Sequence, residues 1–156
     1  MRPDLCVEVY LALLNYSCRY AGDEMKSILV VEDDDAIRGS LEKILTKSGF
    51  TTVEASNGRD ALAAFDPRTI DAVVLDLIMP DVEGIETLTK LRRSSPDVRV
   101  LAISGGGQIG AGEYLDLAKK LGARATLEKP FTPEAFLEAL NRVLGAAASG
   151  AAPAAI

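Results

Sequence analysis

Apolar residues in this chain follow two alternating spacings, one typical of buried strands and the other typical of helices. Short continuous apolar runs indicate strands buried on both faces, and they lie at residues 27–31, 51–55, 71–75, 98–103 and 124–127. Between these runs, apolar residues recur every three or four positions. This spacing predicts helices that follow residues 35 and 58 and that span about 85–94, 113–121 and 133–144.

Five strand–helix units in series predict a parallel sheet, because parallel neighbours need crossover connections. The helices then cover both faces of the sheet, which is the doubly wound α/β class. We expect the first helix to be capped by Asp34 or Asp35 and to end at Gly49. Asp81 and Gly84 are interpreted as a helix cap and a turn ahead of the third helix.

The composition changes at Met25. Residues 1–24 hold both cysteines and three of the four tyrosines, whereas the regular alternation begins within three residues of Met25. We expect one domain over residues 25–145. Two hypotheses remain open for residues 1–24: Met25 is the natural start, or the extension forms a short helix that docks on the domain or mediates dimerisation. The small, uncharged residues of segment 146–156 predict a disordered tail.

Charge and composition narrow the range of functions. The formal net charge is −6, which disfavours binding to nucleic acid or to a membrane surface, because both need a basic face. The chain has no histidine, so any phosphoryl donor must be another molecule. Cys6 and Cys18 fit neither a metal motif nor a disulfide framework and predict reduced thiols in a cytoplasmic protein. No apolar run is long enough for a membrane-spanning helix.

Polar residues of unusual kinds follow four of the predicted strands. Glu32 and Asp33 follow the first strand, Asp76 the third, Ser104 the fourth and Lys129 the fifth. Because ligands bind at the carboxyl ends of parallel strands, we expect these side chains to converge at one edge of the sheet. Four consecutive acids directly after a buried strand repel one another unless something such as a bound cation offsets the repulsion.

This combination of groups predicts phosphoryl chemistry. Clustered carboxylates suit Mg²⁺, which keeps several waters and leaves room for phosphate oxygens. Asp76 can then act as a nucleophile toward a phosphoryl group and form an acyl phosphate. Lys129 would supply a second positive contact, Ser104 would donate a hydrogen bond, and Gly105 would let the backbone approach the phosphate. The last two acids of the run are interpreted as cap and surface charges.

Four segments resemble the receiver domain of two-component response regulators. They are "ILVVEDD" at the first strand, "VVLDLIMPDVEG" around the third, "VLAISG" at the fourth and "LEKPF" at the fifth. The resemblance covers about residues 25–145. It implies a flavodoxin-like receiver fold of the single-domain chemotaxis type, with a doubly wound five-stranded parallel sheet of order 2-1-3-4-5 flanked by five helices.

The resemblance also implies roles in metal binding. Asp76 corresponds to the phosphoacceptor, and Glu32 and Asp33 correspond to the acidic pair. Asp33 and Asp76 would bind Mg²⁺ directly, together with the backbone carbonyl of Ile78, and Glu32 would act through a water molecule. Ile78 and Gly106 stand at variable positions that tune dephosphorylation in the family, and neither offers a polar side chain.

Further roles concern the phosphoryl group and the conformational switch. Ser104 resembles the switch hydroxyl of the family, and Gly105 lies beside it. Lys129 resembles the invariant lysine, and the proline that follows is often preceded by a cis peptide bond in the family. The sequence departs from the family three positions before the lysine, where an aromatic residue is usual and Thr126 stands here. The usual coupling between hydroxyl and aromatic ring is therefore in doubt.

The function implied is that of a response regulator and not of an enzyme with an external substrate. Asp76 would accept a phosphoryl group from a histidine kinase or a histidine phosphotransfer protein, and the signal would pass to an unidentified downstream protein. Two other classes remain open. A phosphorylation-independent interaction module is compatible with Thr126. A Mg²⁺-dependent aspartyl phosphatase of the haloacid dehalogenase type is disfavoured, because the second Asp of that chemistry is replaced by Ile78.

Overall fold

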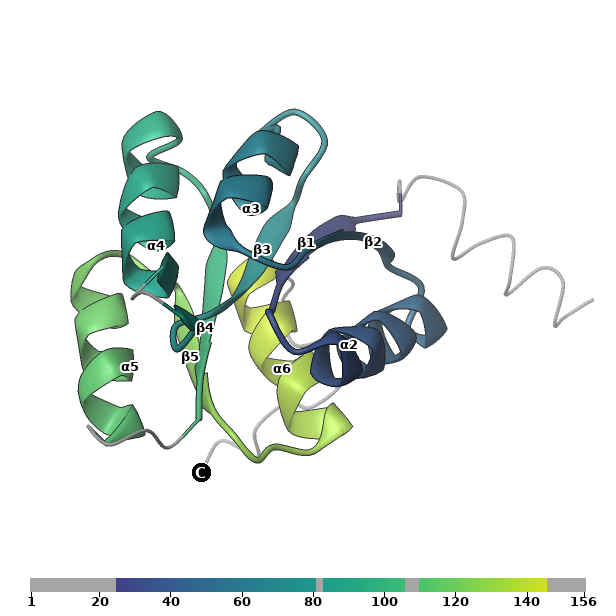
Figure 1. The fold of residues 1–156 in the computed structure, drawn as a ribbon. Coiled ribbons are helices and arrows are strands. Elements are labelled where there is room, and N and C mark those ends of the chain that lie inside the picture. Colours follow the sequence, from purple (N-terminus) through teal and green to yellow (C-terminus); the bar gives the residue numbers. More distant parts are fainter. Residues whose placement is uncertain (1–24, 81–82, 106–109, 146–156) are drawn as a thin grey trace, which may run out of the picture.

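The computed structural model describes residues 25–80, 83–105 and 110–145. The expectations for residues 1–24, Asp81, Gly106 and residues 146–156 lie outside this part of the chain. Strands and helices alternate along the described residues (Figure 1). The strands are β1 (Ser27–Val31), β2 (Thr51–Ala55), β3 (Ala72–Asp76), β4 (Val100–Ser104) and β5 (Ala125–Glu128). The helices are α2 (Asp35–Lys47), α3 (Gly58–Ala64), α4 (Glu83–Ser94), α5 (Ala111–Lys120) and α6 (Pro133–Leu144).

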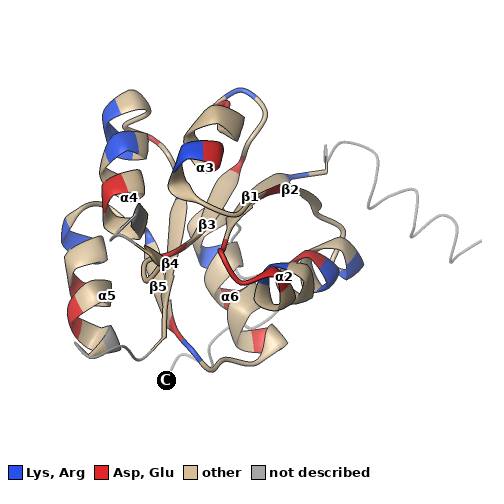
Figure 2. Cartoon of the chain, viewed as in Figure 1, with Lys and Arg blue, Asp and Glu red and all other residues tan. Residues whose placement is uncertain are grey.

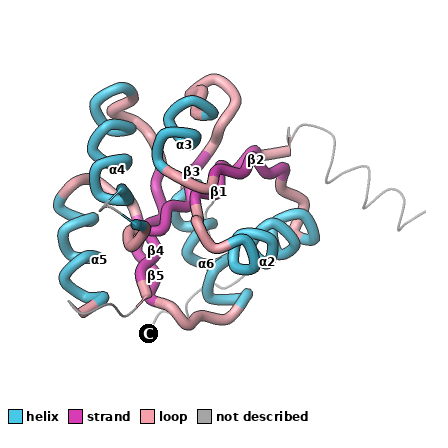
Figure 3. Tube along the Cα trace, in the orientation of Figure 1, coloured by secondary structure: helices cyan, strands magenta, loops and turns pink. Residues whose placement is uncertain are grey.

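The five strands form one parallel sheet in the order β2-β1-β3-β4-β5, which confirms the predicted order. Figure 3 shows the strands as a central layer with helices on either side. The last three strands begin one or two residues later than the sequence predicts and end one residue later. As a result, Asp76 and Ser104 are the final residues of their strands and do not lie in the loops beyond.

Two apolar clusters hold the helices on the two faces of the sheet. On one face, α3, α4 and α5 pack through residues such as Ala61, Leu88 and Ala118. On the other face, α2 and α6 pack through residues such as Leu45 and Phe136. Because β3 and β4 are buried along their whole length, their side chains supply both clusters. Burial on both faces is why these strands read as continuous apolar runs in the sequence.

The ends of α2 agree with the predicted helix caps, whereas the prediction for the start of α4 needs a correction. Asp34 is the N-cap of α2, and its carboxylate accepts hydrogen bonds from the amides of Ala36 and Ile37. Gly49 follows the helix with a φ of 86°, in the left-handed region that favours glycine. The interpretation of Gly84 as a turn residue is wrong, because Gly84 lies inside α4. Its position there reflects a close approach of two backbones, which sequence periodicity does not reveal.

Charged residues are distributed unevenly between the two edges of the sheet. Four helices carry basic residues in their last turn, where they complement the negative end of the helix dipole: Lys47, Arg92, Arg93, Lys119, Lys120 and Arg142. Figure 2 shows acidic residues at the loop between β1 and α2, on the opposite edge. A cluster of acids therefore lies at the carboxyl ends of the strands, and several basic residues lie at their amino ends. Among the described helices, none is both long and apolar enough to cross a membrane.

Phe136 is the largest fully buried side chain on the face covered by α2 and α6, and its ring stacks on Phe131 with centroids 5.7 Å apart. We expect Phe136→Ala to lower the free energy of unfolding by about 3–5 kcal/mol, because it removes buried apolar area and leaves a cavity. Urea denaturation followed by circular dichroism measures this change. Leu117→Ala, at a position 41% exposed on α5, is the control and should change stability by no more than about 0.5 kcal/mol. Equal losses in the two variants would contradict this account of the core.

Candidate functional site

The expected site residues lie at the carboxyl edge of the sheet, where backbone hydrogen bonds continue past the strand ends. The amide of Glu32 donates to the carbonyl of Ala55 at 3.1 Å. The amide of Lys129 donates to the carbonyl of Ser104 at 2.9 Å, which ties the end of β5 to the end of β4. These bonds fix the backbone on either side of Asp76 and bring the side chains at the strand ends close together.

Lys129 connects two of the acids across the sheet. Its ammonium group lies 2.8 Å from Oε2 of Glu32 and 3.2 Å from Oδ2 of Asp76. The side chains of Glu32 and Asp76 are only 3% and 5% exposed, whereas that of Lys129 is 20% exposed. A carboxylate that is buried to this degree needs a partner. Lys129 therefore supplies the positive charge that lets the two acids share one small space.

Three carboxylates come close enough together to hold a metal ion. One oxygen from each of Glu32, Asp33 and Asp76 lies within 4.8 Å of the others. Asp33 is exposed, so this group of acids opens to solvent on one side. An oxygen-only donor set with an open side fits Mg²⁺, which prefers carboxylate oxygens and keeps part of its water shell. The predicted direct and water-mediated roles of the individual acids stay predictions.

Burial shifts the proton affinity of both members of the Glu32–Lys129 pair. Burial raises the pKa of Glu32 to about 7, and the charge of Asp76 adds to this rise, although the hydrogen bond from Lys129 opposes it. For Lys129, burial lowers the pKa, but the hydrogen bond to Glu32 and the charges of Asp76 and Glu32 outweigh that effect and raise it. The ammonium group is thus held in its charged form, while Glu32 titrates near neutral pH.

Asp76 is oriented by its own loop. Its Oδ1 accepts a hydrogen bond from the amide of Ile78 at 3.0 Å, while Oδ2 faces Lys129. Each oxygen of the carboxylate therefore has one hydrogen-bond donor among the residues that the structure describes. The apolar side chain of Ile78, which is half-buried, offers no proton donor or acceptor beside it. The role of the Ile78 carbonyl as a metal ligand stays a prediction.

Ser104, Gly105 and Thr126 lie on the other side of Asp76. Ser104 is fully buried, and its hydroxyl donates a long hydrogen bond of 3.4 Å to the carbonyl of Gly105. A Cβ at Gly105 would meet only the aliphatic part of Lys129, at 3.5 Å. Thr126 pairs with Ala102 of β4 and is half-buried on the face that α5 covers. The position that usually carries the aromatic switch residue is thus occupied by a small side chain within β5.

Arg38 is a residue of the site that sequence reasoning missed. Its Nη1 donates to the carbonyl of Glu32 at 2.9 Å, and its Nη2 lies 2.6 Å from the carboxylate of Asp35. This guanidinium holds the acidic loop against the first turn of α2 and offsets part of its charge. The spacing of three residues between Asp35 and Arg38 is a signal in the sequence, because such residues are neighbours on a helix surface. The contact with the Glu32 carbonyl has no such signal.

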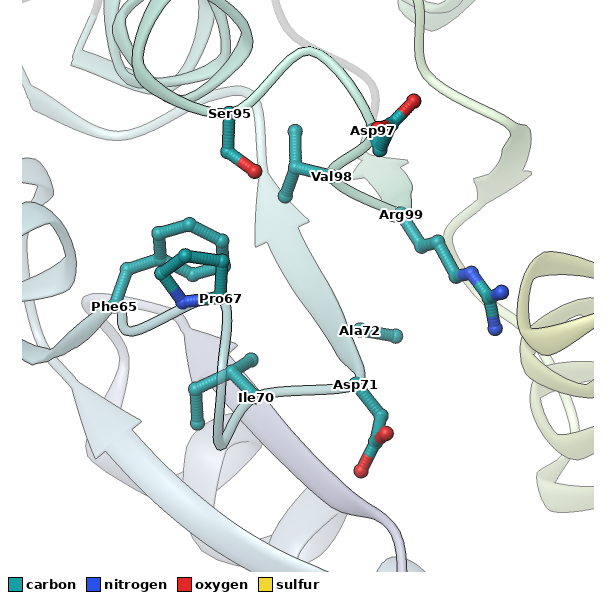
Figure 4. Close-up of a pocket in the computed structure, with 9 residues that line it drawn as sticks. All are labelled: Phe65, Pro67, Ile70, Asp71, Ala72, Ser95, Asp97, Val98 and Arg99. Carbon is teal, nitrogen blue, oxygen red and sulfur yellow. The ribbon is translucent and has the colours of Figure 1, made fainter.

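A cavity of about 260 Å³ lies at the opposite edge of the sheet, and its lining shows no reactive arrangement (Figure 4). One wall of the cavity is formed by Phe65, Pro67 and Ile70. The side chains of Asp71 and Arg99 point away from the cavity. Asp71 accepts a hydrogen bond from the amide of Ser27, and Arg99 donates to the carbonyl of Leu144, so both have structural partners. The cavity therefore takes no part in the chemistry at the carboxyl edge.

Comparison with known proteins agrees with this geometry. The sequence profile described as "Response regulator receiver domain" matches residues 28–141. The chain is 34% identical to "Chemotaxis protein CheY" of Thermotoga maritima over 119 residues, which cover 76% of this chain and 97% of that protein. It is 30% identical over 119 residues to "Sporulation initiation phosphotransferase F" of Bacillus subtilis, with 76% and 94% of the two chains covered.

A solved structure is also similar. The CheY-like receiver domain protein from Methanospirillum hungatei JF-1 superposes with a TM-score of 0.70 at 29% identity, over 78% of this chain and 95% of that chain. The strand order of the sheet, the buried acids at its carboxyl edge and the match over residues 28–141 agree with one another. The chain therefore belongs to the family of response regulator receiver domains of two-component systems, which are signalling domains.

Proposed function

We propose that Asp76 accepts a phosphoryl group from a phosphohistidine of another protein and that the modified domain signals by binding a further protein. The observation that carries this proposal is the environment of the Asp76 carboxylate. It is buried, hydrogen-bonded to Lys129 at 3.2 Å, and within 4.8 Å of two further carboxylates. A carboxylate placed between a fixed cation and a group of acids suited to Mg²⁺ is arranged for attack on phosphorus.

The proposed transfer uses an oxygen of the Asp76 carboxylate as the nucleophile. A bond forms between this oxygen and phosphorus, the P–N bond of the donor phosphohistidine breaks, and the imidazole nitrogen keeps the electron pair and takes up a proton. Lys129 stabilises the negative charge on the phosphoryl oxygens, and its raised pKa keeps it charged throughout. Ser104 can turn its hydroxyl from the long contact with Gly105 toward a phosphoryl oxygen.

Mg²⁺ is the proposed cofactor. Asp33, Asp76 and the carbonyl of Ile78 would hold it, with Glu32 binding through water. When bound, Mg²⁺ supplies charge neutralisation for the transferring group. Support comes from the three carboxylates, whose oxygens lie within 4.8 Å of one another and which open to solvent at Asp33.

A histidine kinase or a histidine phosphotransfer protein is the proposed donor, and a groove beside the acids supports docking of such a partner. The groove is a cavity of about 300 Å³ between α2 and the start of α6. Its lining is mostly apolar and comprises Ala36, Ile37, Ser40, Leu41, Ile44, Phe131 and Pro133. The groove begins three residues after Asp33 and two residues after Lys129, so a helix bound there would reach the carboxyl edge of the sheet.

We place the output of the domain on the face formed by α5, β5 and α6. A cytoplasmic location is part of the same proposal. Phosphorylation replaces the single negative charge of the Asp76 carboxylate with a phosphoryl group that carries about −1.5 to −2 charges, so up to about one negative charge is added beside Lys129, at the end of β5. The added charge competes with Glu32 for the ammonium group and so biases β5 and the helices that flank it. With Thr126 in the middle of β5, this bias acts through Lys129 and the backbone and not through a large ring.

Specific residues distinguish the proposed function from two other candidate functions. A phosphorylation-independent interaction module is left open by Thr126 and by the terminal extension, whereas the intact acid pair, Asp76 and Lys129 argue against it. An aspartyl phosphatase of the haloacid dehalogenase type would need a second Asp two residues after the nucleophile as general acid, yet that position carries the apolar Ile78, whose amide donates to the Asp76 carboxylate. We expect no turnover of small phosphate esters, and steady release of phosphate would overturn the assignment as a signalling domain.

The proposed transfer predicts a covalent phosphate on one residue. Incubation of the purified chain with acetyl phosphate and Mg²⁺ should give a single phosphate adduct by intact mass. Asp76→Asn should abolish the adduct because it removes the nucleophile, and Asp33→Asn should reduce it at least tenfold because it removes a metal ligand. Asp97→Asn is the matched control, since Asp97 is exposed and lines the cavity at the opposite edge of the sheet. An unlabelled wild type, with a kinase as well as with acetyl phosphate, would make the interaction module the better account.

The raised pKa of Glu32 predicts a pH dependence of stability in the absence of metal. Between the ordinary pKa of 4.5 in the unfolded chain and about 7 in the folded protein, the folded state holds a proton that the unfolded state has released. The free energy of unfolding should therefore fall as the pH rises from about 5 to 8. We expect a smaller fall for Glu32→Gln in urea titrations with EDTA, and a smaller fall for the wild type when Mg²⁺ is added. Parallel pH profiles for wild type and variant would show that Glu32 is not the group that titrates.

A further inference from the structure

Gly84 is the second residue of α4, is buried, and occupies a position where glycine is normally unfavourable. Glycine inside a helix costs about 0.5–1 kcal/mol relative to alanine. Gly39 in α2 and Gly112 in α5 also lie within helices, and a Cβ at either would meet nothing within 4 Å. At those two positions alanine could be accommodated. Gly84 differs from them in what lies beside it.

The helix at Gly84 packs directly on the backbone at the end of β3. A Cβ at this position would lie 2.5 Å from the carbonyl oxygen of Asp76, 2.5 Å from the Cα of Leu77 and 2.6 Å from the Leu77 carbonyl oxygen. All three distances are far below van der Waals contact, and all three atoms belong to the main chain. A side chain could turn aside, but here either the helix or the strand end would have to move.

Both elements are held from their other sides. The amide of Leu77 donates to the carbonyl of Ile103 at 2.9 Å, which continues the sheet beyond β3. Leu88 and Leu91 of α4 are fully buried in the apolar cluster beneath the helix. Displacement of the helix would disturb this packing, while displacement of the strand end would disturb the hydrogen bond to β4. Because Gly84 touches the main chain of Asp76 itself, part of the displacement reaches that residue.

We infer that Gly84 is a positioning residue for the phosphoacceptor: its missing side chain lets α4 seat against the backbone of Asp76 and Leu77, and this contact sets where the Asp76 carboxylate lies relative to Lys129 and the acidic pair. The inference rests on the proposed function of Asp76. Gly84 itself touches neither a metal nor a phosphoryl group. Its effect passes through the backbone to a carboxylate whose oxygens are placed 3.0 Å from the Ile78 amide and 3.2 Å from the Lys129 ammonium.

The experiment compares Gly84→Ala with Gly39→Ala and Gly112→Ala, which make the same substitution in helices with open space. Each variant is assayed at a temperature where circular dichroism shows it fully folded. We expect Gly84→Ala to be phosphorylated by acetyl phosphate at least tenfold more slowly than wild type at saturating donor, and to bind Mg²⁺ at least threefold more weakly. The two control variants should match wild type in both measurements and should be equally or more stable to heat.

Mg²⁺ affinity separates positioning from a purely structural role, since a folded but less stable protein would bind the ion as wild type does. If Gly84→Ala binds Mg²⁺ and accepts phosphate at wild-type rates while folded, the inference is wrong. If Gly84→Ala does not fold alone, the same assays are made with an added osmolyte and in a background that carries Gly39→Ala. Should wild type itself accept no phosphate, the proposed function fails, and the Mg²⁺ affinities of wild type and variant still decide whether Gly84 positions Asp76.

Discussion

The ammonium group of Lys129 is the interaction on which the functional edge of this domain depends. Glu32 and Asp76 come from separate strands and are both buried, and like charges in such a place repel and lose hydration. One cation that bonds to both acids offsets this cost in the free protein. In the proposed transfer, the same ammonium group would also contact the incoming phosphoryl group. One side chain would then both stabilise the buried acids and bind the phosphoryl oxygens, exchanging its carboxylate partners for them.

The surrounding structure makes that exchange possible without loss of the fold. The amide of Lys129 donates to the carbonyl of Ser104, so β5 stays paired with β4 when the side chain of Lys129 changes its anion. Arg38 bonds to the backbone of Glu32 and not to its carboxylate. The carboxylates can therefore change protonation or partner without separation of the strands. Paired strands with exchangeable side-chain contacts are a suitable arrangement for a reversible modification.

Much of the fold and of the candidate site could be predicted from the sequence. The spacing of apolar residues indicated the strands and helices, and the positions of polar residues after the strands indicated the site. Continuous apolar runs at β1, β3 and β4 follow from burial on both faces, and the polar residues at the strand ends identified the edge where they meet. The contact of Arg38 with the Glu32 carbonyl and the seat of Gly84 against Asp76 could not be predicted. In both cases a residue contacts the main chain of another segment. Because main-chain atoms are the same in nearly every residue, the sequence gives no sign of such contacts. The prediction of a turn at Gly84 was wrong for this reason. Glycine is needed there because the main chain of Asp76 and Leu77 lies too close for a side chain, and not because the backbone turns at Gly84.

The amino edge of the sheet has a consequence for how the domain can be tethered. The described domain begins with a strand, β1, and ends with a helix, α6, so both ends emerge at the edge opposite the acids. The C-terminal carbonyls of α6 are secured there by Arg99 and Arg124. Any chain that joins the domain at residue 25 or residue 145 is attached one strand length, about 15–20 Å, from Asp76. A linker at either end is therefore attached on the side opposite the acids. It leaves the acidic face unobstructed, and the domain can reorient to present this face to a partner protein.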